Sequence, residues 1–445
     1  MRIAALAVVV ALVTSAVAAL VGMGSVDAGT ILLLLVLAAV TLPICWRLGT
    51  ASDPWIWWVA NLGFAAKLSG AAIRYWVLVE EYGGIGDATG YHGNGTRLAE
   101  VWRTWQIPPL DGRMGEGTQV VRWLTGLLYA PYTPSMLGGF LLFATFAFFG
   151  QLLFYAAFRR AVPGARLGPY AAFIFFLPAL VFWPSSIGKE SLMLLFLGLA
   201  SYGLARALAA FRPFWLLVAA TGLAGAGIIR PHIAALLALS FAIAVLVGRS
   251  GWQGATGVRR LMVLAVGIVL VGVSISTFAS RYDLEAADDV DPFIGEVQSS
   301  TQQGGSEVQG TPIRSPSELP AGVIRVLFRP LPHEAHNLQA MANAIESTAL
   351  LAIIIWKLPA MIRHARQLRG PYVLMSAAFT AGFTVAFSAV FNLGILARQR
   401  SQVFPFLLAV VVALGWRARY ELEPAEPAQL SLTSSAASIS VGRTY

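Results

Sequence analysis

Long apolar segments alternate with short polar connections along most of this chain. The segments run for about 17 to 25 residues, the length that an α-helix needs to cross a hydrocarbon core of about 30 Å. Charged residues gather in the connections and are rare within the segments. Because backbone groups in lipid must be satisfied inside the protein, segments this long and continuous predict transmembrane α-helices rather than barrel strands.

The pattern predicts an all-α fold, a polytopic transmembrane helical bundle with about twelve spans. The expected spans cover residues 3–23, 29–46, 56–79, 134–158, 168–185, 190–210, 214–229, 231–248, 260–279, 342–362, 371–391 and 401–418. The first span has an alternative interpretation as a cleaved signal peptide, because Arg2 precedes an apolar stretch that reaches the small residues Ser15 to Ala18.

Basic residues mark every second connection and so indicate an orientation. They are Arg47, Arg159, Arg160, Arg166, Arg206, Arg212, Arg249, Arg259, Arg260, Lys357, Arg363, Arg366, Arg369, Arg417 and Arg419. Short loops rich in Arg and Lys stay in the cytoplasm. We therefore expect both termini in the cytoplasm and the remaining connections on the outer face of the membrane.

The chain is expected to form one transmembrane domain over residues 1–420 with two long outer connections, 80–132 and 281–341. The first of these is expected to hold two interfacial helices. The tail over 421–445 is rich in Ser, Ala and Pro, a composition that cannot bury a core, and is expected to be a disordered cytoplasmic segment.

The interfacial helices are predicted at residues 96–106 and 118–129, where Trp, Leu and Val recur at helical spacing beside arginines. This pattern is typical of amphipathic helices that lie in the plane of the membrane surface. In the second long connection, residues 299–320 are rich in Ser, Gln, Gly and Pro, which predicts flexibility. Residues 323–337 become apolar and basic again, so this part is expected to return to the membrane surface.

Composition supports a membrane protein. The chain is 57% hydrophobic and 12% charged, with a mean hydropathy of +0.70, which excludes an ordinary soluble globule. The net charge of +9 follows from the orientation bias and does not require nucleic acid as a partner. One cysteine, Cys45, leaves no intrachain disulfide. The many Arg and Ala residues are typical of a GC-rich bacterial genome, so the expected location is a bacterial cytoplasmic membrane.

Unusual polar residues gather in the connections assigned to the outer face. Ionisable groups at a membrane boundary are costly and are therefore functional candidates. Asp87 is the candidate catalytic base, and the candidate substrate-binding residues are Tyr91, His92, Lys189, Glu190, Arg230, His232, Arg329, Glu334, Arg398 and Arg400. Each cluster alone also fits a structural interpretation: Lys189 and Glu190 as a pair at a helix start, Arg398 and Arg400 as interfacial anchors.

Taken together, these cations favour an anionic ligand whose tail lies in lipid. Arginine binds phosphate oxygens through two parallel hydrogen bonds, and lysine adds a point charge. A polyprenyl phosphate that carries a sugar or glycan fits this chemistry. Its phosphate would leave as an anion, and the acceptor hydroxyl would need a base. Asp87 is placed to serve, with Glu334 or His232 as alternatives. No histidine cluster has metal spacing, so no cofactor is expected; a divalent metal is left open but nothing indicates it.

Four short motifs resemble multi-pass C-type glycosyltransferases (the GT-C fold) and bacterial exopolysaccharide-assembly membrane enzymes. The motifs are Gly86-Asp87-Ala-Thr-Gly-Tyr91, Phe182-Trp-Pro-Ser-Ser-Ile-Gly-Lys-Glu190, Leu327-Phe-Arg-Pro-Leu-Pro-His-Glu-Ala335 and Arg398-Gln-Arg400. The resemblance implies transfer of a hexosyl or pentosyl group from a polyprenyl-phosphate donor to a glycan or other hydroxyl acceptor on the outer face, in cell-envelope polysaccharide biosynthesis. It also implies Asp87 as the base and the outer cations as the phosphate site.

Two other functions stay open. The acidic loop here follows the third expected span, whereas in GT-C enzymes it usually follows the first, and Asp87 has no adjacent acid. An O-antigen polymerase or ligase type, acting on lipid-diphosphate oligosaccharides, shares about twelve spans and a large late outer loop. A transporter or flippase without covalent chemistry would carry polar groups near the membrane midplane, where Lys67 and Arg74 are the candidates.

Overall fold

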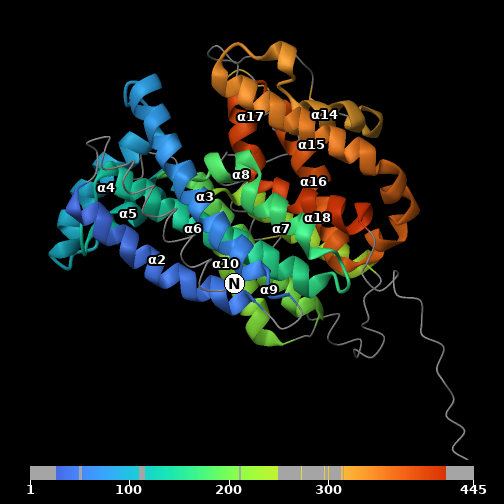
Figure 1. Ribbon diagram of the computed structural model, residues 1–445, viewed down its shortest axis with the longest axis horizontal. Helices are drawn as coiled ribbons and strands as arrows, with labels where there is room; N and C mark the ends of the chain where they lie inside the picture. The colour runs from blue at the N-terminus through green and yellow to red at the C-terminus, as the bar shows by residue number, and fades with distance from the viewer. Residues whose placement is uncertain are drawn as a thin grey trace, which may run out of the picture.

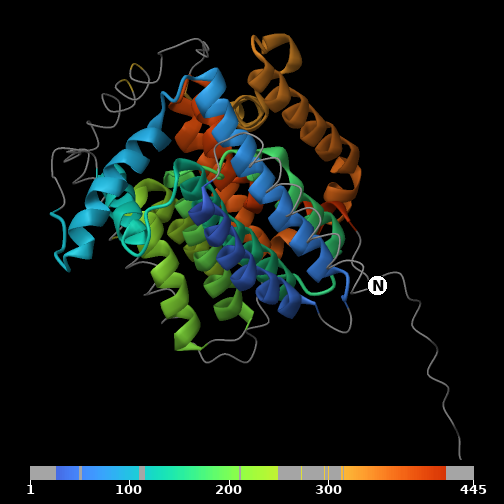
Figure 2. The same ribbon diagram turned by 60° about the vertical axis from the view of Figure 1, so that its left-hand side comes forward.

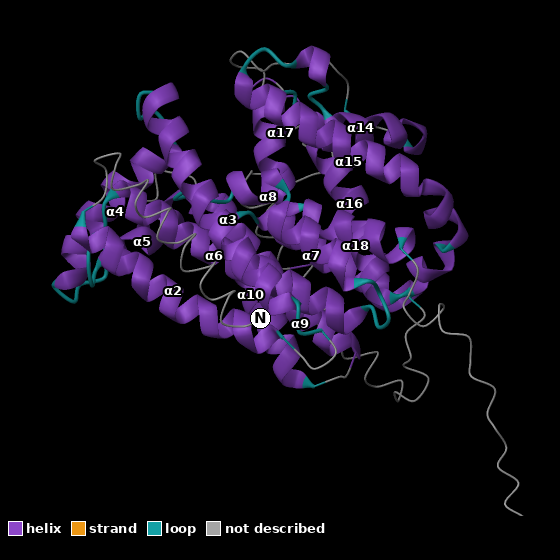
Figure 3. Ribbon diagram, viewed as in Figure 1, coloured by secondary structure: helices purple, strands orange, loops and turns teal. Residues whose placement is uncertain are grey.

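The computed structural model describes residues 27–49, 53–109, 116–209, 212–248, 312–313 and 315–416, with single residues at 272, 295 and 299. Within these ranges the chain consists of helices and loops and contains no strand (Figure 3). The all-α prediction is therefore confirmed for the described part of the chain. The expected spans 3–23 and 260–279 and the tail 421–445 lie outside it.

Six helices in the described residues are long and apolar enough to cross a membrane. They are α2 (Ala28–Leu48), α3 (Ile56–Trp76) with its π-helical extension η1 (Val77–Glu81), α6 (Met136–Ala161), α9 (Lys189–Ala209), α15 (Leu338–Arg363), and α16 (Pro371–Ala386) with the turn η7 (Phe387–Ala389). A seventh span arises if Leu393–Gln402 and Phe404–Gly415, which meet at 62°, count as one. The protein is thus a multi-pass helical membrane protein.

Three of the expected spans are helical but shorter than a full crossing. Residues 168–185 divide into α7 (Leu167–Phe176) and α8 (Pro178–Phe182). Pro178 causes the break, because the residue before a proline is driven out of the helical region, and Leu177 is extended with ψ of 123°. The helices α10 (Pro213–Ile229) and α11 (Pro231–Val247) have 17 residues each. Within the described residues the structure therefore supports six to seven spans, and about twelve spans are not shown.

The bent pair at the end of the described chain consists of α17 (Leu393–Gln399), the turn η8 (Arg400–Gln402) and α18 (Phe404–Gly415). In Figure 1 this red segment lies beside α15 and α16, on the opposite side of the molecule from blue α2. Before it comes α14 (Leu319–Phe328), with a turn at Pro332–Glu334 that leads into α15. The predicted return of residues 323–337 to the membrane surface stays a prediction.

The two segments predicted to form interfacial helices are helical, as α4 (Asp87–Arg103) and α5 (Glu116–Tyr129). The first begins earlier than its apolar pattern indicated, at Asp87 itself. The two helices pack against each other, with Gly95 and Gly126 each at a close contact with the other helix. Figures 1 and 2 show the pair at one edge of the bundle, connected to α3 by a short turn.

Close helix packing in the centre depends on small residues. The helix α9 packs between α6 and α10, and α11 packs on α16. At the α6–α9 crossing, a Cβ on Gly150 would overlap the Leu194 backbone and one on Gly198 would overlap the Gly150 backbone. Small residues allow such approach in membranes, where apolar burial between helices gains little over lipid contact. Exposed Leu32 on α2 and Trp356 on α15 are suited to face lipid.

Candidate functional site

A cavity of about 730 Å³ lies where the ends of several helices meet. The turn before α4, the N-terminus of α9, the α10–α11 junction, and α17 all contribute to it, with α5 on one side. Its charged lining residues are Arg74, Asp87, Arg122, Lys189, Glu190, Arg230 and Arg398. Six of the predicted site residues line this cavity: Asp87, Tyr91, Lys189, Glu190, Arg230 and Arg398.

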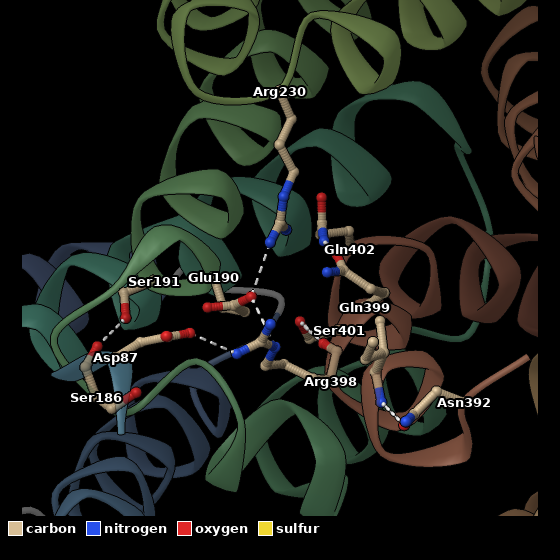
Figure 4. Close-up of polar contacts among 11 residues, drawn as sticks. Asp87, Ser186, Glu190, Ser191, Arg230, Asn392, Arg398, Gln399, Ser401 and Gln402 are labelled. Carbon is tan, nitrogen blue, oxygen red and sulfur yellow. Dashed lines mark hydrogen bonds and ion pairs between the residues drawn. The ribbon is translucent and has the colours of Figure 1, made fainter. Parts of the chain in front are cut away.

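An ion-pair network connects four of these residues (Figure 4). Arg398 Nη1 donates to Asp87 Oδ2 at 2.9 Å, across 311 positions in the sequence. Arg398 Nε lies 3.3 Å from Glu190 Oε1, and Arg230 Nη2 donates to the same oxygen at 2.8 Å. The Glu190 and Arg230 side chains are about nine-tenths buried, whereas the Asp87 side chain is 69% exposed. Arg398 is thus shared between a buried carboxylate and an accessible one.

Helix termini place both carboxylates. Gly83 and Gly84 adopt φ of 56° and 76°, a left-handed turn that glycine makes without steric cost. This turn brings the chain from η1 directly into α4, so that Asp87 is the first helical residue. Glu190 is the second residue of α9. Negative side chains are stabilised at helix N-termini by the unpaired N–H groups and the helix dipole, which makes both positions favourable for an acid.

Helix junctions place both arginines. Arg230 is the single residue between α10 and α11, followed by Pro231 at the first position of α11. Arg398 lies in the last turn of α17, whose N-cap Asn392 accepts a hydrogen bond from Ile395 N at 3.0 Å. Both junctions lie in connections that the basic-residue pattern predicts to be on the outer face. The sequence argument therefore identified residues that the fold brings together, although it did not reveal the ion pairs.

Arg74 was not predicted as a site residue, yet it lines the cavity from within α3. Its guanidinium carbon lies 4.9 Å from the Phe182 ring centroid and 4.8 Å from that of Trp183. Such stacking holds an arginine in place while leaving its N–H groups available. The available sequence signal was an arginine inside an apolar span, which was interpreted as a transport feature. Arg122, on α5, is a second cavity cation outside the predicted set.

Aromatic side chains close the cavity wall. Tyr91 is buried, and burial raises the pKa of its hydroxyl despite a hydrogen bond with Thr118 that acts in the opposite direction. The Tyr91 hydroxyl therefore stays protonated and can donate to a ligand. His92, the next residue, is not among the lining residues: its Nδ1 lies 3.2 Å from Tyr129 Oη, and burial lowers the pKa of the imidazole. His232 lies beside the Phe387 ring and is also not in the lining.

The remaining predicted residues form a separate cluster that does not line the cavity. Arg329 forms an ion pair with Glu334, and the second carboxylate oxygen of Glu334 accepts from Leu331 N at 2.7 Å. Burial alone would raise the pKa of Glu334, but these two hydrogen bonds outweigh it and lower that pKa. Arg400 is buried and donates to the carbonyls of Val326 and Arg329. This geometry favours a structural role, the connection of α14 to η8.

An apolar groove of about 520 Å³ adjoins the cavity. Its apolar wall consists of Gly70, Ile73, Trp76, Val77, Pro178, Val181, Phe182, Leu338 and Ala342. Tyr82 and Gln339 line both the groove and the cavity, and Tyr82 Oη donates to Gln339 Oε1 at 2.7 Å. The two spaces are therefore neighbours that share one hydrogen-bonded wall.

Two acidic residues, Glu81 and Glu346, line the apolar groove. Glu346 Oε1 accepts a hydrogen bond at 2.9 Å from Ala179 N, an amide that the helix break at Pro178 leaves without an intrahelical partner. The neighbouring Leu180 carbonyl accepts from buried Lys67 Nζ at 2.6 Å. These contacts satisfy the polar backbone groups of the broken helix.

Within the described ranges no group of three or more His, Cys, Asp or Glu side chains is arranged to hold a metal ion. No protein-family model, curated protein or solved structure matches the chain. Evidence about function therefore comes from the geometry of the cavity and the groove.

Proposed function

We propose that this protein is a membrane glycosyltransferase that moves a sugar from a lipid-linked phosphate donor to a glycan or other hydroxyl acceptor. The observation that supports this most directly is the ion-paired Asp87–Arg398 unit in a cationic cavity that adjoins an apolar groove. The cavity offers donors for phosphate oxygens, and the groove offers an apolar path for an isoprenoid tail. A water-soluble anion has no apolar part that could bind in the groove.

The proposed setting is the outer face of a bacterial cytoplasmic membrane, with both termini in the cytoplasm. The distribution of basic connections supports this orientation. The finer topology of about twelve spans belongs to the same proposal, with α7–α8, α10 and α11 as short or broken crossings and two further spans at 3–23 and 260–279.

In the proposed reaction the acceptor hydroxyl oxygen attacks the anomeric carbon of the donor sugar. The bond between that carbon and the phosphate oxygen breaks, and the electron pair leaves with the phosphate. Asp87 takes the proton from the hydroxyl, while Arg398 and Arg230 stabilise the negative charge that develops on the leaving phosphate. Arg398 donates a hydrogen bond to Asp87, so a donor phosphate competes for this guanidinium and frees Asp87 to act as base.

Replacement of Asp87 tests the proposal. Purified protein in liposomes would receive a radiolabelled polyprenyl-phosphate hexose together with a cell-envelope glycan as acceptor. We expect Asp87→Asn to lower transfer by about 10²-fold or more, the usual contribution of a general base. Glu80→Gln is the matched control, since Glu80 is a nearby exposed carboxylate that does not line the cavity. Transfer at the unaltered rate in Asp87→Asn would remove Asp87 as the base.

A transporter or flippase of lipid-linked glycans is the second candidate function. The observation that favours it is the broken helix α7–α8, whose polar groups are met by Lys67 and Glu346, because discontinuous helices with ionisable partners are typical of transport sites. The bent α17–α18 pair is a further discontinuity. Counterflow of a labelled lipid-linked glycan in sealed vesicles, with no new covalent product, would establish this function and refute the transferase.

A further inference from the structure

The charges that line the cavity do not balance. Apart from Arg122, four cationic side chains and two carboxylates line it, an excess of two positive charges. Both carboxylates are already engaged, Asp87 by Arg398 and Glu190 by Arg230 and Arg398. By contrast, no described carboxylate lies within ion-pair distance of Arg74 or Lys189. These two cations therefore line the cavity without a carboxylate as ion-pair partner.

Buried hydrogen-bond donors at the same cavity also lack acceptors. Arg230 Nη1 and Trp183 Nε1 are both buried and have no hydrogen-bond partner in the described structure. The Arg230 side chain is only 10% exposed, so water does not readily replace the missing acceptor. Buried donors without acceptors are costly and rare in folded proteins. A ligand rich in acceptor oxygens would satisfy them.

We propose that the donor carries a diphosphate rather than a monophosphate between its lipid and its sugar. This inference rests on the proposed function. A lipid–phosphate–sugar is a phosphodiester with one negative charge, whereas a lipid–diphosphate–sugar has two charges and more acceptor oxygens. The larger charge matches the excess in the cavity and gives Arg74 and Lys189 each an anionic partner. Arg74 and Lys189 are thus the residues that determine specificity for the diphosphate.

The positions of the cations indicate which phosphate of the ligand each of them contacts. Arg74 stacks on Phe182, which lines the groove, and it follows Ile73, another groove residue. It therefore meets the phosphate next to the lipid tail. Arg230 and Arg398 both contact Glu190, and Arg398 also contacts Asp87, so they meet the phosphate next to the sugar. In this arrangement the bond that breaks lies beside the proposed base, and the departing group is the lipid diphosphate.

Binding of short isoprenoid probes tests the inference. The purified protein in detergent would be titrated calorimetrically with farnesyl diphosphate, farnesyl phosphate and inorganic pyrophosphate. We expect farnesyl diphosphate to bind about tenfold or more tightly than either other probe, a difference of about 1.4 kcal/mol. The comparison with pyrophosphate separates a lipid diphosphate from the free anion.

Variants identify the responsible residues. Arg74→Gln and Lys189→Gln should each reduce the preference for diphosphate over monophosphate severalfold while farnesyl phosphate binding changes little. Lys189→Arg should retain the preference. Arg206→Gln is the control, because Arg206 packs on Trp215 near the other end of α9. An unchanged melting temperature shows that a variant is folded. If Arg74→Gln does not fold, the Lys189→Gln and Lys189→Arg variants test the inference.

Several outcomes would overturn the inference. Equal affinity for farnesyl diphosphate and farnesyl phosphate refutes the diphosphate preference but leaves the proposed transferase intact. Equal affinity for farnesyl diphosphate and pyrophosphate refutes the lipid part of the ligand. An unchanged preference in both glutamine variants refutes the assignment to Arg74 and Lys189. If the unaltered protein binds none of the three probes, the proposed function fails together with the inference.

Discussion

Arg398 links the two carboxylates of the cavity, and its position explains why neither is a free base at rest. It contacts Asp87 at 2.9 Å and Glu190 at 3.3 Å. Glu190 keeps a second partner in Arg230, whereas Asp87 forms no other ion pair among the described residues and is mostly exposed. Of the two acids, Asp87 is therefore the one that a donor phosphate would release.

Replacement of Arg398 should weaken donor binding. We expect Arg398→Ala to reduce affinity for a lipid-linked phosphate donor by about tenfold to a hundredfold, since it removes a charge-assisted contact and frees Asp87 to repel the anion. The measurement is a titration of the protein in liposomes with the lipid-linked phosphate donor. Lys357→Ala is the control, because Lys357 stacks on Trp356 and Trp416 at the other end of α15. Equal losses in the two variants would contradict a phosphate site at this cavity.

The residue types of the site could be predicted in part. Lys189, Arg230 and Arg398 were identified because they oppose the charge bias of the membrane. Asp87 was identified because it follows a predicted span in the first long outer connection, and all four residues line one cavity. Arg74 was missed as a binding residue because its aromatic partners Phe182 and Trp183 lie on another segment. Arg329 and Arg400 were included although each is committed to nearby partners, since a carbonyl acceptor leaves no trace in the sequence pattern.

At the scale of elements, prolines decide where the apolar pattern and the actual helices differ. A run of apolar residues predicts burial in lipid, but Pro178 divides one run into α7 and α8. At Pro231, by contrast, the expected boundary between spans 214–229 and 231–248 agrees with the start of α11. Hydropathy averages over such breaks and therefore counts each run as a full span. The proline at position 178 was the sequence signal for this helix break. Pro178 also lines the apolar groove.

The crossing of α6 and α9 makes a prediction about stability. We expect Gly198→Ala to lower the melting temperature of the detergent-solubilised protein, because the added methyl group would overlap the Gly150 backbone; overpacking of this kind costs about 1–3 kcal/mol. Gly168→Ala on α7 is the matched control, since open space surrounds a Cβ there. Equal melting temperatures for the two variants would show that this crossing adjusts freely.

At the scale of the whole molecule, the cavity and the basic turn Ala365–Arg369 lie at opposite ends of α15. The helix α15 begins beside the cavity, where Gln339 forms part of the wall, and runs for 26 residues, or about 39 Å, to Arg363. The basic turn Ala365–Arg369 follows. One long helix thus separates the proposed phosphate site from a predicted cytoplasmic loop, as expected if substrates meet the protein at the outer face.

Cysteine labelling in intact cells tests this sidedness. The chain has one cysteine, Cys45, which is fully buried, so an introduced cysteine would be the accessible thiol. We expect a membrane-impermeant maleimide to label Ile107→Cys, beyond α4 at a position 74% exposed, and to leave Arg366→Cys unlabelled until the cells are opened. Immediate labelling of Arg366→Cys with protection of Ile107→Cys would place the cavity in the cytoplasm. A donor presented on the outer leaflet could not then reach Asp87, and the transferase proposal would have to give way to a reaction on the inner face.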